Sequence, residues 1–81
     1  MIYLVDDDAA ACCAISAFLG TSGYSVKSFP SAEAFLEVAD SAVEGIMLLD
    51  LRMTGMSGIE LQSELPKRGI DLPIIFITGY G

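Results

Sequence analysis

The sequence predicts an α/β domain in which the four strands of a parallel sheet alternate with three helices. Four short apolar runs recur along the 81 residues, and each of them fits a strand. Segments with the apolar spacing of helices separate these runs. Strands that alternate with helices pair in parallel through right-handed crossovers and carry helices on both faces of the sheet. A chain of this length suffices for one small domain and not for two.

The first strand and helix surround three consecutive aspartates. Residues 2–5 form a wholly apolar run, as in a buried strand, and the aspartates follow at once. Residues 9–19 have the composition of a helix, for which Asp8 is the expected N-cap. The apolar face of this helix is expected to carry Ala11, Ile15, Phe18 and Leu19.

The second strand and the third strand differ in pattern. Residues 24–29 alternate apolar and polar side chains, which predicts a half-exposed strand at an edge of the sheet. Ser31 is the expected cap of a helix that runs through about residue 39. Residues 46–49 are wholly apolar and therefore predict a central strand, which ends at Asp50.

A loop, a helix and a strand complete the chain. Ser57 and Glu60 have the spacing of a capping box, which predicts the start of the third helix. Pro66 and Gly69 are expected to end this helix. Residues 72–78 form the fourth apolar run and predict the fourth strand.

Composition excludes several classes of function. Eleven acidic and four basic residues give a net charge of −7, which argues against direct binding to nucleic acid. The longest mostly apolar stretch, residues 9–19, is too short to cross a bilayer, and no basic segment precedes the first strand as in a signal peptide. We therefore expect a cytoplasmic protein. Cys12 and Cys13 are adjacent and no histidine is present, so neither a disulfide nor a zinc site is expected.

Polar residues with useful chemistry follow three of the predicted strands. Asp6 and Asp7 follow the first strand, Asp50 ends the third, and Thr78 ends the fourth. In parallel sheets, ligands bind beyond the carboxyl ends of the strands. Carboxylates held close together repel one another unless a cation lies between them, and Mg²⁺ prefers such oxygen ligands. A carboxylate beside Mg²⁺ can act as the nucleophile in phosphoryl transfer.

The sequence resembles the receiver domain of two-component response regulators, particularly its FixJ-like branch. The segments that carry the resemblance are Leu4-Val5-Asp6-Asp7-Asp8, Leu48-Leu49-Asp50-Leu51-Arg52-Met53, Gly55-Met56-Ser57-Gly58-Ile59-Glu60-Leu61 and Pro73-Ile74-Ile75-Phe76-Ile77-Thr78-Gly79. They occur in the order of the family and extend over the whole chain. The resemblance implies a flavodoxin-like sheet with strand order 2-1-3-4 and a histidine kinase as the phosphoryl donor.

The resemblance also implies a role for each site residue. Asp50 would be the phosphoacceptor, Asp7 a direct ligand of Mg²⁺, and Asp6 a ligand mainly through metal-bound water. The backbone carbonyl of Arg52 would complete the protein's share of the coordination. Thr78 would be the switch hydroxyl that approaches the phosphoryl group.

Residues 1–81 depart from the pattern of the family in two ways. The family's domain continues with a fourth helix, a fifth strand that bears a lysine and a fifth helix, so a C-terminally truncated receiver with impaired phosphorylation is expected. Thr54 stands where the family usually has proline, which is expected to loosen the loop after Asp50. The fourth strand is apolar and would lie at an edge of the sheet, so self-association into a homo-oligomer is also expected.

Two alternatives remain open. An inactive receiver fragment could self-associate through its exposed fourth strand and act as an interaction module. A haloacid-dehalogenase-like phosphatase also has an aspartate and, four residues on, a threonine, as in Asp50 and Thr54, but Arg52 stands where its acid–base aspartate should be. A receiver would not be an enzyme beyond self-phosphorylation and self-dephosphorylation.

Overall fold

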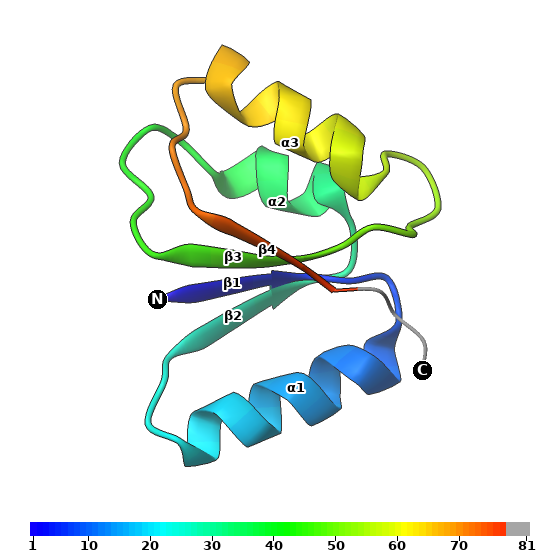
Figure 1. Ribbon diagram of the computed structural model, residues 1–81, viewed down its shortest axis with the longest axis vertical. Helices are drawn as coiled ribbons and strands as arrows, with labels where there is room; N and C mark the ends of the chain where they lie inside the picture. The colour runs from blue at the N-terminus through cyan, green and yellow to red at the C-terminus, as the bar shows by residue number, and fades with distance from the viewer. Residues whose placement is uncertain (78–81) are drawn as a thin grey trace.

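The computed structural model describes residues 1–77 and contains one four-stranded sheet (Figure 1). The strands are β1 (Ile2–Val5), β2 (Val26–Phe29), β3 (Ile46–Asp50) and β4 (Ile74–Ile77). All three pairings are parallel, and the order is β2-β1-β3-β4. The predicted α/β class and the predicted strand order are therefore confirmed.

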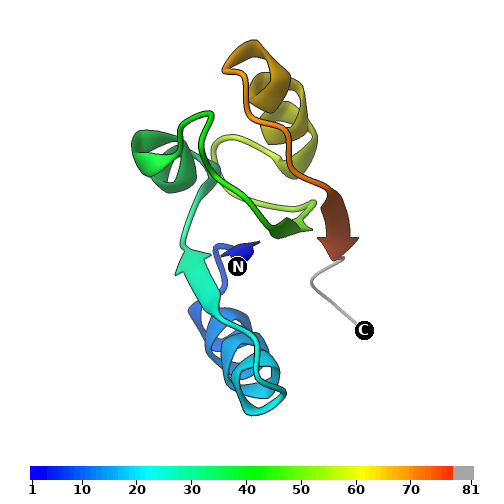
Figure 2. The same cartoon turned by 90° about the vertical axis from the view of Figure 1, so that its left-hand side faces the viewer.

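Three helices cover the two faces of this sheet. α1 (Ala9–Thr21) lies on one face, whereas α2 (Ala32–Val38) and α3 (Gly58–Lys67) lie together on the other (Figures 1 and 2). We call these the α1 face and the α2–α3 face. This arrangement follows from right-handed crossovers between parallel strands. The connection from β1 to β2 runs toward one edge of the sheet, whereas the connections through α2 and α3 run toward the other edge, so α1 lies on the opposite face from α2 and α3.

The core lies on the α2–α3 face. Phe35 of α2 is fully buried, and its ring makes edge-to-face contacts with the rings of Tyr3 and Phe29. Apolar side chains of β1, β3, α2 and α3 surround it. The buried members of this cluster are Val5, Phe29, Ala32, Phe35, Leu36, Met47, Leu49, Leu61, Leu65, Ile70 and Leu72.

The helix starts confirm the predicted caps. The side chain of Asp8 accepts hydrogen bonds from two backbone N–H groups of α1, and Ser31 accepts one from α2. Ser57 and Glu60 form both bonds of a capping box at the start of α3. The predicted stop at Pro66 is wrong, because Pro66 lies inside α3, which ends one residue later. Gly69, with φ of 72°, then turns the chain.

The α1 face is much less covered than the α2–α3 face. No residue of α1 is buried, and the side chain of Phe18 is 70% exposed. Its predicted place on the packed face of the helix is therefore wrong, whereas Ala11, Ile15 and Leu19 are half-buried. No helix within residues 1–77 is long and apolar enough to cross a membrane.

β4 is an edge strand of the sheet formed by residues 1–77. Ile75, on its α1 face, is 52% exposed. An apolar edge of this kind is the feature on which the predicted self-association depends. The self-association itself stays a prediction.

Candidate functional site

Three aspartates meet at the carboxyl ends of β1 and β3. Asp6, Asp7 and Asp50 each offer a carboxylate oxygen, and these three oxygens lie within 4.8 Å of one another. Asp6 and Asp7 belong to the turn after β1, whereas Asp50 is the last residue of β3. Because β1 and β3 are paired neighbours and run in parallel, residues distant in the sequence converge here.

Asp6 is a buried carboxylate close to other negative charges. Its side chain is 2% exposed, and its Oδ1 accepts a hydrogen bond of 2.9 Å from the backbone N–H of Asp8. Burial raises the pKa of Asp6, and the nearby charges of Asp50 and Asp7 raise this pKa further. A cation between the three carboxylates would relieve both effects.

Asp50 is the second buried carboxylate of the cluster. It is 3% exposed, and its Oδ1 accepts a hydrogen bond of 3.0 Å from the backbone N–H of Arg52. Gly58, at the start of α3, packs directly against the backbone of Asp50. A Cβ atom at residue 58 would lie 2.5 Å from the carbonyl oxygen of Asp50, so only glycine permits this contact.

Asp7 is the exposed member of the cluster and has a partner that the sequence did not reveal. Its Oδ2 accepts hydrogen bonds from the backbone N–H of Thr54 at 3.0 Å and from the Thr54 hydroxyl at 3.1 Å. These two bonds lower the pKa of Asp7, because they stabilise the ionised carboxylate. The expectation that Thr54 loosens the loop missed this contact. The two residues are 47 positions apart, and no local pattern signals their approach.

The loop that carries Thr54 has a second anchor. Glu33 of α2 accepts a hydrogen bond of 3.2 Å at its Oε2 from the backbone N–H of Met56. Gly55 lies between the two anchored residues and has φ of 78°, a conformation that favours glycine. Glu33 lies in the first turn of α2, and no local pattern signals its contact with Met56, 23 positions further along the chain.

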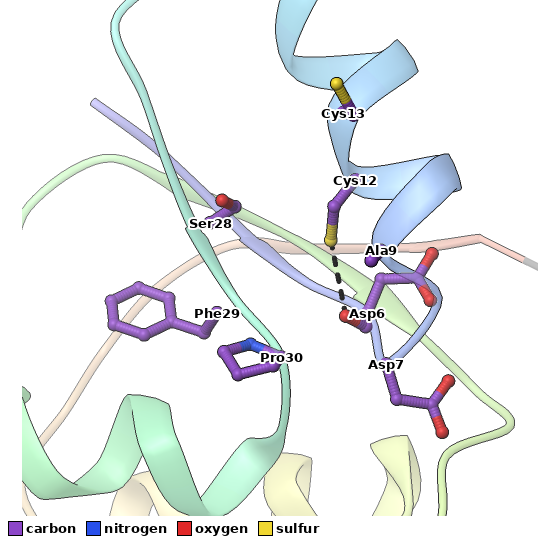
Figure 3. A pocket seen from close by; sticks show the side chains of 8 residues that line it. All are labelled: Asp6, Asp7, Ala9, Cys12, Cys13, Ser28, Phe29 and Pro30. Atoms are coloured by element: carbon purple, nitrogen blue, oxygen red, sulfur yellow. Dashed lines mark hydrogen bonds between the residues drawn. The ribbon is translucent and has the colours of Figure 1, made fainter.

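A cavity of about 300 Å³ lies next to the carboxylates, between the start of α1 and the end of β2. Figure 3 shows Asp6, Asp7 and Cys12 at one side of this cavity and Phe29 and Pro30 at another. The Cys12 thiol donates a hydrogen bond of 3.2 Å to the backbone carbonyl oxygen of Asp6. Burial raises the pKa of this thiol, as do the nearby carboxylates, so Cys12 is a neutral group of the cavity wall.

The predicted site residues divide into three groups. Asp6, Asp7 and Asp50 are brought together as expected. Arg52 contacts Asp50 through its backbone N–H, and the predicted role of its carbonyl group stays a prediction. Thr78, the predicted switch hydroxyl, lies outside the described residues.

Comparisons with known proteins point to one family. Residues 2–81 match the family described as "Response regulator receiver domain". The chain is 44% identical over 81 residues to the response regulator protein TmoT of Ectopseudomonas mendocina. This match covers 100% of the chain and 37% of TmoT, so the chain spans little more than a third of that relative.

Solved structures agree with this match. A crystal structure of FixJ-N superposes with a TM-score of 0.89 at 40% identity, covering 99% of this chain and 64% of FixJ-N. A structure of the response regulator protein TrrA from Thermotoga maritima, in complex with Mg²⁺-BeF, has a TM-score of 0.85 at 30% identity. That match covers 99% of this chain and 70% of TrrA. The fold and these matches show that the chain belongs to the family of response regulator receiver domains of two-component systems.

Proposed function

We propose that this chain accepts a phosphoryl group on Asp50, in a site where Asp6, Asp7 and Asp50 hold Mg²⁺. The observation that carries the proposal is the approach of the three carboxylate oxygens to within 4.8 Å of one another. Receiver domains are signalling domains rather than classical enzymes, and they are phosphorylated by histidine kinases. We therefore propose a histidine kinase as the partner that supplies the phosphoryl group.

The donor set fits Mg²⁺. Carboxylate oxygens are the hard ligands that Mg²⁺ prefers, and three of them lie within 4.8 Å of one another. In this proposal Asp7 is a direct ligand, Asp6 acts mainly through metal-bound water, and the Arg52 carbonyl completes the set. The bound ion would neutralise charge that builds on the transferring phosphoryl group. TrrA was solved in complex with Mg²⁺-BeF, which supports Mg²⁺ as the ion of this site.

Asp50 is the proposed nucleophile. A carboxylate oxygen of Asp50 attacks phosphorus, the bond from phosphorus to the donor atom breaks, and the donor leaves with the bonding electron pair. The backbone N–H of Arg52 orients the carboxylate through its Oδ1. By resemblance to the family, the Thr78 hydroxyl would then donate a hydrogen bond to a phosphoryl oxygen.

Phosphorylation with a small donor tests this proposal directly. The 81-residue chain is incubated with Mg²⁺ and acetyl phosphate, and its intact mass is measured. We expect one added phosphoryl group in the parent chain and none in Asp50→Asn. Asp8→Asn is the matched control, because Asp8 caps α1 and is not one of the three clustered aspartates, and asparagine also caps helices.

The measured mass distinguishes a chain that is phosphorylated on Asp50 from an inactive receiver. An adduct that persists in Asp50→Asn would contradict the assignment of Asp50. No adduct in the parent chain, despite Mg²⁺ binding, would favour the alternative of an inactive receiver that self-associates. The exposed edge at β4 is the observation that supports that alternative.

A further inference from the structure

Asp7 differs from the other two carboxylates of the cluster in how it is held. Asp6 and Asp50 are almost completely buried, and each accepts a hydrogen bond from a backbone N–H two residues further along its own loop. Asp7 is exposed and therefore has room to turn toward water. Repulsion from two nearby carboxylates favours that movement whenever no cation is bound.

Thr54 opposes this movement of Asp7. Its backbone N–H and its hydroxyl both donate to Oδ2 of Asp7, at 3.0 and 3.1 Å. Hydrogen bonds to an ionised acceptor are stronger than those between neutral groups. Two donors on one oxygen also define the direction in which the carboxylate points, which a single donor does not. The contact thus keeps Asp7 close to Asp6 and Asp50 without a metal.

The position of Thr54 depends in turn on the loop after β3. Met56, two residues further on, is bonded to Glu33 of α2 through its backbone N–H. Gly55 between them adopts a positive φ, and a Cβ atom there would lie 2.9 Å from Oε2 of Glu33. Thr54 therefore belongs to a short segment held at one end by Asp7 and at the other by α2.

We propose that Thr54 is a positioning residue that places Asp7 for cation binding before the cation arrives. The inference rests on the proposed function, in which this cluster binds Mg²⁺. Mg²⁺ requires near-ideal octahedral geometry, so a ligand that is already in place avoids the cost of ordering it on binding. Loss of the Thr54 hydroxyl should therefore weaken Mg²⁺ binding although Thr54 itself supplies no ligand atom.

Titration with Mg²⁺ alone tests this role. The dissociation constant is measured from amide chemical shifts in two-dimensional NMR spectra of the 81-residue chain. We expect Thr54→Val, which removes the hydroxyl and keeps the shape of the side chain, to weaken binding about three- to tenfold. Thr54→Ser restores the hydroxyl and should bind within about twofold of the parent chain. If Thr54→Val does not fold, Thr54→Ala replaces it.

Two further variants separate positioning from a general effect on the fold. Thr21→Val is the matched control, because the Thr21 hydroxyl bonds to the Phe18 carbonyl at the far end of α1, so binding should be unchanged. In an Asp7→Asn background, Thr54→Val should add less than about a twofold effect, because the residue acts through Asp7. If Thr54→Val weakens Mg²⁺ binding as much in the Asp7→Asn background as it does in the parent chain, the positioning role is overturned.

The same titration distinguishes this inference from the proposed function. Mg²⁺ binding by the parent chain together with less than about threefold weakening in Thr54→Val overturns the inference and leaves the proposed function intact. Weakening in Thr54→Ser equal to that in Thr54→Val also overturns it. A parent chain that does not bind Mg²⁺ overturns both the inference and the metal site on which it rests.

Discussion

The two faces of the sheet differ in packing and in chemistry. The α2–α3 face holds the continuous apolar core, whereas the α1 face is covered by a helix with no buried residue. Successive residues of a strand point to opposite faces, so Asp50 shares the α1 face with Leu48, and Asp6 shares it with Leu4. The buried carboxylates therefore belong to the face with less packing around it.

The two faces therefore contribute differently to stability and to the site. Charged groups cost free energy when they are buried in a dense apolar core, and that cost is smaller where water and a cation can approach. The α2–α3 face can then supply most of the stability, while the α1 face tolerates the repulsion between the aspartates. Substitutions on the two faces should consequently change the free energy of unfolding by different amounts, and even in opposite directions.

The largest effect is expected for Leu61→Ala on the α2–α3 face. Leu61 is fully buried between α3 and the sheet, and its truncation leaves a cavity in the core. We expect the free energy of unfolding to fall by about 2–5 kcal/mol. Urea denaturation followed by circular dichroism measures this loss. A loss below about 1 kcal/mol would show that the α2–α3 face is not the main source of stability.

A smaller effect of opposite sign is expected for Asp6→Asn. Asparagine keeps an oxygen that can accept from the Asp8 N–H, and it removes a buried charge beside Asp50. Without divalent cations at pH 7, the free energy of unfolding should rise by about 1 kcal/mol, which corresponds to about 4–8 °C in Tm. Thermal unfolding followed by circular dichroism measures the change, and a lower Tm would contradict it.

The difference in Tm between Asp6→Asn and the parent chain should depend on pH. The pKa of Asp6 is raised in the folded state, so the folded protein takes up this proton before the unfolded chain does. The parent chain should gain stability from Asp6 as pH falls through the raised pKa, and this gain is complete below the unfolded value of about 3.9. The Tm advantage of Asp6→Asn should therefore shrink as the solution is acidified.

The smallest effect is expected for Phe18→Ala on the α1 face. The Phe18 side chain is 70% exposed, so its removal creates no cavity. We expect the free energy of unfolding to change by less than about 0.5 kcal/mol, a value typical of surface substitutions. Urea denaturation compares it directly with Leu61→Ala. A loss as large as that of Leu61→Ala would remove the distinction between the two faces.

Much of the fold and part of the site could be predicted because they depend on short segments. The apolar runs that became β1 and β3, the caps at Asp8, Ser31 and Ser57, and the aspartates at the strand ends are all local features. The convergence of Asp6 and Asp7 with Asp50 followed from a general property of parallel sheets, in which the carboxyl ends of the strands share one edge.

Tertiary structure alone decided which side chains are covered and which loops touch. Phe18 has the helical spacing of a packed residue, but nothing within residues 1–77 buries it. The contact of Thr54 with Asp7 joins two loops 47 residues apart, and it exists because β1 and β3 are neighbours and Glu33 holds the same loop. Local patterns encode periodicity and caps over a few residues, whereas such contacts depend on how distant elements pack.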